Sequence, residues 1–107
     1  MALLISKSET ALLTIEGTSI GLDSVYVRLD LSANQNGINM HSALYYYVDK
    51  TAFDSGSEVV SITGMENAYY LEADQEAGES QTILVASEKI KAALEEAGYA
   101  VEIVDLW

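Results

Sequence analysis

Apolar and polar residues alternate through two neighbouring stretches, residues 25–33 and 38–48. Apolar side chains take mainly odd positions in the first stretch and mainly even positions in the second. Because successive side chains of a strand point to opposite faces, each stretch predicts a strand with one apolar face. Asn36 and Gly37 lie between them and favour a tight turn with positive φ angles. The pattern therefore predicts a β-hairpin.

The parity of the apolar positions sets the register of this hairpin. A loop of two residues, or one of four from Asn34 to Gly37, places both apolar sets on one face. A loop of three would put them out of phase unless a bulge intervened. We therefore expect Leu29 to face Leu44 and Val27 to face Tyr46. The expected buried face consists of Val25, Val27, Leu29, Leu44, Tyr46 and Val48.

The opposite face of the hairpin is expected to carry an aromatic stripe made of Tyr26, Arg28, Tyr45 and Tyr47. In the expected register Tyr26 faces Tyr47 and Arg28 faces Tyr45, and such cross-strand pairs stabilise a sheet. Two interpretations stay open. Aromatic side chains mostly belong to cores, which favours a stripe covered by a helix or by other strands. Tyrosine and arginine are also enriched at interfaces, so the four residues are our candidate interface with another chain.

A helical pattern precedes the C-terminal residues. Ser87, Ile90, Ala93, Leu94 and Ala97 fall on one stripe at helical spacing, and Gly98 is well placed to end the helix. The adjoining residues 81–86 suit a helix or a strand, because the run contains β-branched side chains. We expect one helix from about Gln81, with Ser80 or Ser87 as its N-cap.

The remaining elements are expected to be short. Asp49–Gly56 predicts a helical turn or a loop closed by Gly56, and Asp74–Glu79 predicts an acidic turn. Together the elements predict an α+β fold, a mainly antiparallel β-sheet or small β-barrel or sandwich with one C-terminal helix packed on it. A length of 107 residues predicts a single domain over residues 1–107. Further short strands are expected at Leu3–Lys7, Leu12–Glu16, Glu58–Ile62, Tyr69–Glu72 and Tyr99–Leu106.

Composition excludes several classes of function. The net charge of −12 argues against nucleic-acid and anionic-membrane partners, which attract basic patches. The absence of cysteine excludes disulfides and thiolate chemistry. No apolar run approaches the ~20 residues of a membrane span, and we expect no secretion signal at the N-terminus. We therefore expect the chain to be made in a cytoplasm.

Catalytic patterns are equally sparse. His41 is the single histidine, and no nucleophile motif accompanies it, so we expect it to make hydrogen bonds on a strand surface. No glycine pattern forms a phosphate loop. We expect no enzyme, no metal and no cofactor, and we place a small carboxylate-dependent enzyme last among the alternatives. Two acidic stretches lack the spacing of a calcium loop and are expected to be solvated turns: Asp49, Asp54 and Glu58, and Glu72, Asp74, Glu76 and Glu79.

Two short motifs carry a resemblance. The stretch Val25–Leu29 reads VYVRL, and Lys50–Gly56, after the hairpin, reads KTAFDSG. Residues 24–56 resemble a class of small structural proteins of tailed phages, in which a tyrosine–x–arginine strand leads into a hairpin. In that class a lysine–x–alanine–phenylalanine–x–x–glycine turn follows the hairpin.

The resemblance implies a virion part joined to head, tail or baseplate, acting through protein contacts and not through catalysis. Its partners would be other virion proteins, copies of itself, or both. The alternative is a small cytoplasmic bacterial binding or regulatory module.

Overall fold

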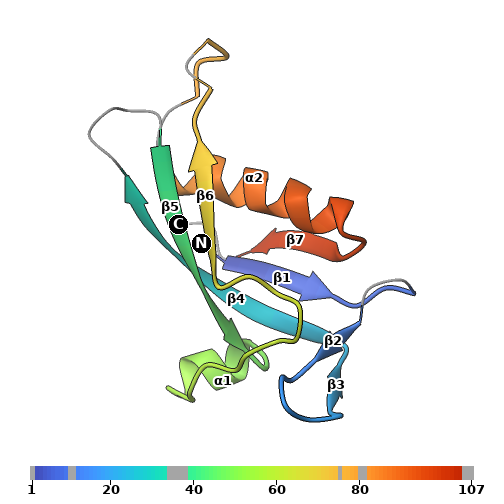
Figure 1. The fold of residues 1–107 in the computed structure, drawn as a ribbon. Coiled ribbons are helices and arrows are strands. Elements are labelled where there is room, and N and C mark those ends of the chain that lie inside the picture. The colour runs from blue at the N-terminus through green and yellow to red at the C-terminus, as the bar shows by residue number, and fades with distance from the viewer. Residues whose placement is uncertain (1, 10–11, 34–38, 75, 80–81, 105–107) are drawn as a thin grey trace.

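An antiparallel sheet organises the molecule, and one long helix packs against one of its faces (Figure 1). Within the described residues the main sheet has five strands in the order β6-β5-β4-β1-β7, and β2 pairs with β3 separately. The fold is the α+β fold that the pattern predicts. The computed structural model describes residues 2–9, 12–33, 39–74, 76–79 and 82–104. The elements are β1 (Ala2–Ser6), β2 (Leu13–Thr14), β3 (Gly21–Leu22), β4 (Ser24–Ala33), β5 (Asn39–Tyr47), α1 (Lys50–Asp54), β6 (Ala68–Glu72), α2 (Ile83–Glu96) and β7 (Ala100–Val104).

The hairpin of β4 and β5 forms in the expected register. Leu29 pairs with Leu44 and Val27 with Tyr46, as parity predicts. The turn itself, residues 34–38, lies outside the described residues. The prediction for Val48 is wrong, because its side chain is 39% exposed. β5 ends one residue earlier, where the chain turns toward α1, so Val48 has no place on the buried face.

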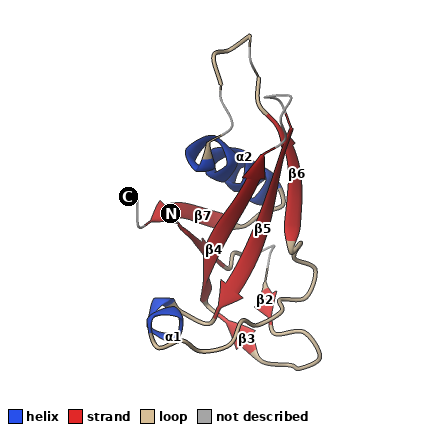
Figure 2. Ribbon diagram, turned by 90° about the vertical axis from the view of Figure 1, so that its left-hand side faces the viewer, coloured by secondary structure: helices blue, strands red, loops and turns tan. Residues whose placement is uncertain are grey.

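The hydrophobic core lies between α2 and one face of the sheet (Figure 2). Each strand contributes alternate residues to this face. From its predicted stripe, α2 buries Ser87, Ile90 and Leu94, whereas Ala93 and Ala97 are exposed. Pairing of β4 with both β1 and β5 brings these alternate positions into one layer. Buried members of this core include Leu3, Ile5, Val25, Val27, Leu29, Leu44, Tyr46, Ile90, Leu94 and Val101.

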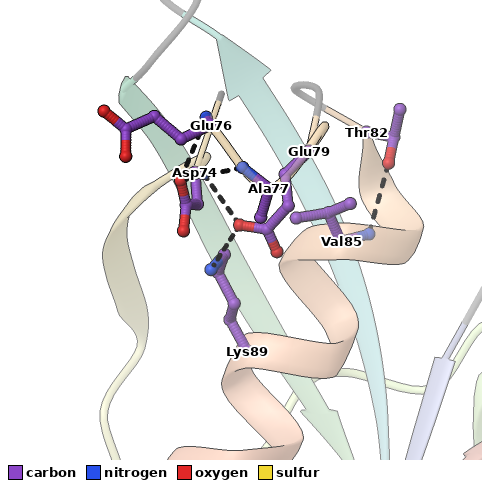
Figure 3. A network of polar contacts seen from close by, with 7 residues as sticks. All are labelled: Asp74, Glu76, Ala77, Glu79, Thr82, Val85 and Lys89. Carbon is purple, nitrogen blue, oxygen red and sulfur yellow. Dashed lines mark hydrogen bonds and ion pairs between the residues drawn. The ribbon is translucent and has the colours of Figure 1, made fainter.

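The helix α2 begins with a cap that the sequence pattern did not indicate. Thr82 is the N-cap, and its Oγ1 accepts a hydrogen bond from the Val85 N–H at 3.2 Å (Figure 3). Ser87 is buried inside the helix, where its Oγ donates to the Ile83 carbonyl at 2.6 Å. The expectation of Ser87 as N-cap is therefore wrong. Ser80 and Gln81 lie outside the described residues, but residues 83–86 belong to the helix.

The end of α2 confirms the role of Gly98. This glycine has a φ of 103°, a conformation that costs little without a Cβ. Its N–H donates to the Glu95 carbonyl, and the Tyr99 N–H donates to the Leu94 carbonyl. This pair of bonds is the Schellman motif, which stops the helix and turns the chain directly into β7.

One expected strand does not form. Residues 58–62 make only two isolated bridges, Val60 to Tyr46 and Ile62 to Ile15. Each bridge joins this segment to a different neighbour, so no continuous ladder develops. The strand expected at Leu12–Glu16 shortens to β2. The other expected short strands appear as β1, β6 and β7, and residues 105 and 106 of the last one lie outside the described residues.

Candidate functional site

The predicted aromatic stripe lies on the face of the sheet opposite α2, which we call the open face. Tyr26 pairs with Tyr47 and Arg28 with Tyr45, as the register predicts. The third strand of this surface, β6, pairs with β5. The central part of the open face consists of Tyr26, Arg28, Asp30 and Ser32 on β4, Asn39, His41, Ala43, Tyr45 and Tyr47 on β5, and Ala68, Tyr70 and Glu72 on β6.

One end of the stripe is covered by the chain itself. The ring of Phe53, from α1, has its centroid 5.6 Å from that of Tyr26 and 5.1 Å from that of Tyr47. The Arg28 guanidinium lies over the same ring, 5.0 Å from its centroid. Tyr26 is only 2% exposed. At this end, therefore, the stripe belongs to the intrachain packing.

Hydrogen bonds at the two ends of α1 help to position Phe53 over the stripe. Asp49 is the N-cap of α1, and its Oδ1 accepts a hydrogen bond from the Ala52 N–H at 2.7 Å. After the helix, the Gly56 N–H donates to the Phe53 carbonyl and the Ser57 N–H to the Ala52 carbonyl. Gly56 adopts a φ of 75°. Of the two alternatives expected for Asp49–Gly56, a helical turn or a loop, the structure forms the helical turn, and Gly56 follows its C-cap. This turn holds the phenylalanine ring against the sheet.

Farther along the open face, one residue of the stripe and one of β6 are exposed. Tyr45 is 42% exposed, and Tyr70 of β6 is 84% exposed. The rings of His41 and Tyr70 lie with centroids 4.9 Å apart. Between Tyr45 and this pair, Ala43 pairs with Ala68. Their methyl side chains project only a short way from the sheet. The result is a patch of aromatic rings around a floor of small residues.

Two shallow depressions flank this floor. One, of about 250 Å³, is lined by residues that include Tyr45, Val59 and Asn67. The other, of about 300 Å³, is lined by residues that include His41 and Tyr70. Such volumes lie at or below the lower end of the range for small-molecule pockets. Their size suits single side chains of a protein partner better than a bound cofactor.

The sequence pattern did not place Tyr70 in the candidate site. The residue belongs to an expected short strand, but the run Tyr69-Tyr70-Leu71 does not show which ring turns outward. The pairing of Tyr70 with His41 settles this, because paired residues share a face. Only this long-range pairing adds Tyr70 to the patch.

Two carboxylates of the second acidic stretch, those of Asp74 and Glu79, make structural contacts. Asp74 Oδ1 accepts hydrogen bonds from the Glu76 and Ala77 N–H groups at 3.1 and 3.2 Å (Figure 3). Glu79 Oε1 accepts one from the Asp74 N–H at 2.7 Å and lies 2.9 Å from Lys89 Nζ of α2. The hydrogen bond from Lys89, followed by that from Asp74, holds the pKa of Glu79 below its usual value. These carboxylates therefore tie the turn before α2 to the helix.

In the described part of the chain, the residues that could bind a metal ion are not gathered into a site. No group of three or more histidine, cysteine, aspartate or glutamate residues there could hold a metal ion. His41 is half-buried on the open face, opposite Ser32 and beside Tyr70. Among the residues that the structure describes, the exposed rings of the open face therefore form the candidate site.

No protein-family model, curated protein or solved structure matches this chain. Among the described residues, no helix combines the length and the apolarity needed to cross a membrane. The phage resemblance and the interface role of the stripe stay predictions.

Proposed function

We propose that this chain is a non-enzymatic structural subunit that acts through protein–protein contacts in a tailed-phage particle, joined to head, tail or baseplate. The observation that carries the contact role is the exposed aromatic patch around Tyr45 and Tyr70. Tyrosine combines a large apolar body with a polar tip, which is the composition of interface centres. The phage setting is supported by the resemblance of residues 24–56.

The four candidate interface residues have different parts in this proposal. Tyr45 is the contact residue, because it stands exposed on the open face. Tyr47 and Arg28 are half-buried beside Phe53 and form the border of the contact. Tyr26 lies beneath Phe53 and acts as support, since almost none of its surface is accessible.

The charge of the chain narrows the class of partner. A net charge of −12 repels nucleic acid and other acidic surfaces, and it favours association with a basic protein surface. Electrostatic attraction of this kind raises association rates and weakens as salt increases. We therefore expect complex formation to be faster at low salt.

The experiment pairs two exposed apolar side chains on opposite sides of the molecule. Tyr45→Ala changes the open face, whereas Leu84→Ala changes α2, where Leu84 is 45% exposed. The full chain and each variant are co-expressed with the proteins encoded by adjacent genes, and complexes are separated by size-exclusion chromatography. Tyr45→Ala should reduce complex formation with little change in melting temperature, and Leu84→Ala should leave the complex intact.

Two results would contradict the proposal. Adjacent genes that encode no capsid, portal or tail protein would remove the phage setting and favour a bacterial binding module. Equal complex formation by the Tyr45→Ala variant and the unaltered chain would remove the open face as the contact surface.

A further inference from the structure

The strand β6 forms one edge of the main sheet, and the phase of its hydrogen bonds can be derived. The Leu44 N–H donates to the Asn67 carbonyl at 2.8 Å. In an antiparallel ladder, hydrogen-bonded pairs alternate with non-hydrogen-bonded pairs. Tyr69 and Leu71 therefore turn their backbone groups toward β5. The N–H and carbonyl groups of Ala68, Tyr70 and Glu72 point away from the sheet.

This outer edge is unpaired within the part of the chain that the structure describes. There, β6 forms a ladder with β5 alone, and Figure 2 shows it at the right-hand margin of the sheet. Tyr70, 84% exposed, stands at its centre. Proteins commonly protect such edges with proline or lysine. The chain contains no proline, and β6 contains no lysine.

We propose that β6 accepts an extended segment of a partner protein as an additional strand, and that this segment alternates apolar with basic residues. The inference rests on the proposed function, since it names how a protein partner is recognised beside the open face. Strand addition draws its affinity from main-chain hydrogen bonds and its specificity from alternate side chains. The outward groups of Ala68, Tyr70 and Glu72 supply the main-chain bonds.

The side chains of β6 indicate the chemistry of the segment. On the open face, an arginine or lysine can lie over the Tyr70 ring and approach the Glu72 carboxylate. On the other face, Tyr69 and Leu71 are half-buried against the core, so the neighbouring positions of the segment should be apolar. An alternation of basic and apolar residues satisfies both faces of one strand.

A second copy of this chain fits the edge poorly. Acidic residues flank β6 on both sides, with Glu66 before it, Glu72 at its end and Asp74 beyond. An antiparallel pair of copies centred on Tyr70 would bring Glu66 of each copy toward Asp74 of the other. A parallel pair in register would set the two Glu72 side chains next to each other. Like charges in these positions destabilise a sheet, so a basic segment is the better occupant.

The test uses the full chain and a short synthetic peptide of alternating arginine and valine, labelled at its N-terminus. Fluorescence anisotropy reports binding, and amide hydrogen exchange reports the edge. The peptide should slow the exchange of the Ala68, Tyr70 and Glu72 N–H groups. A peptide of alternating glutamate and valine should not bind the unaltered chain.

Two matched pairs of variants distinguish strand addition at β6 from nonspecific electrostatic attraction between the basic peptide and the acidic chain. Tyr70→Pro removes an outward N–H without removing a bond to β5, whereas Tyr70→Thr keeps that N–H. We expect Tyr70→Pro to weaken peptide binding at least about tenfold and Tyr70→Thr only a few-fold. Glu72→Lys and Glu102→Lys make the same charge change on β6 and on β7, and only Glu72→Lys should weaken binding strongly.

Several results would overturn the inference. One is peptide binding that leaves the exchange of the three outward N–H groups unchanged, a readout that needs no variant to fold. Others are an unweakened Tyr70→Pro variant, and equal losses from Glu72→Lys and Glu102→Lys. Protection of these groups in the chain alone, rising with its concentration, would assign the edge to a second copy. A failure confined to this peptide assay would leave the Tyr45 experiment standing, so the two proposals fail separately.

Discussion

The two faces of the main sheet are built from the same strands, but one face is buried and much of the other is exposed to solvent. On the face toward α2, side chains such as Val25 and Val27 are completely buried. On the open face, Tyr45 and Tyr70 project into solvent. Alternation along a strand sorts side chains into two faces, but it does not decide which face is covered. The helix that packs on one of them makes that decision.

The open face has a covered end and an exposed end. At one end, the ring of Phe53 packs against Tyr26, which is buried. At the other end, His41 and Tyr70 contact each other, and Tyr70 stays exposed. The core interpretation therefore holds for the Tyr26 end of the stripe, and the interface interpretation stays a prediction for the exposed part. On the open face, α1 covers only one end of the sheet, whereas on the other face α2 packs against several strands.

The largest difference between the faces should appear on truncation of a buried side chain of α2. Ile90→Ala should lower the free energy of unfolding by about 2–5 kcal/mol, because it removes buried methylene groups and leaves a cavity. Tyr45→Ala, on the open face, should cost less than about 1 kcal/mol. Urea denaturation of the two variants measures this difference, and equal losses would show that the open face is also core.

The coverage by Phe53 can be tested next. Phe53→Ala should cost about 1–3 kcal/mol, because it removes the ring contacts to Tyr26, Tyr47 and Arg28. Phe53→Leu keeps apolar cover but loses the ring over which Arg28 lies, so its cost should be smaller. Urea denaturation gives both values. A Phe53→Ala loss no larger than that of Tyr45→Ala would mean that α1 adds nothing to the core.

On the covered face, Tyr46 makes a hydrogen bond through its hydroxyl group, and ionisation of this group makes the stability of the fold depend on pH. The Tyr46 hydroxyl donates a hydrogen bond to the Glu66 carbonyl. Burial, then the neighbouring Tyr69, Glu66 and Tyr99, raises the pKa of Tyr46 above its usual value. The folded state therefore keeps this proton at a pH where the unfolded chain loses it. Stability from this group is complete below pH ~10 and falls as the pH rises further.

Tyr46→Phe tests this anchor. The variant should cost about 1 kcal/mol at neutral pH through loss of the hydrogen bond. Its stability should then decline less steeply than that of the unaltered chain above pH ~10. Thermal unfolding measured across this pH range gives both effects. Tyr70→Phe, on the open face, is the control and should change neither, and an unchanged alkaline decline in Tyr46→Phe would refute the assignment.

The smallest expected effect has the opposite sign. Ser42 is completely buried on the face toward α2, between Leu31 and Tyr69, and its Oγ has no hydrogen-bond partner among the described residues. Ser42→Ala should raise the free energy of unfolding by up to about 1 kcal/mol, because it removes an unpaired buried hydroxyl. Ser32→Ala, exposed on the open face, should stay within about 0.5 kcal/mol. A loss of stability in Ser42→Ala would show that the hydroxyl is paired.

The amino-acid sequence by itself predicts those features that depend on residues close together in the chain. Parity around Asn36 and Gly37 predicts the register of β4 and β5, because a slip by one residue would turn every apolar side chain outward. Gly56 and Gly98 predict the ends of α1 and α2, because each takes a positive φ. The composition of the candidate stripe is equally legible, since Tyr26, Arg28, Tyr45 and Tyr47 follow from the same parity.

Features that depend on distant segments came only from the tertiary structure. Residues 58–62 have the composition of a strand, but their two bridges lead to different neighbours and no ladder forms. The place of Phe53 over Tyr26, and of Tyr70 beside His41, depends on how α1 and β6 return to the hairpin. A local pattern sets the face on which a side chain lies. Whether that side chain is core or surface depends on packing between segments far apart in the chain, because burial is a property of the whole fold.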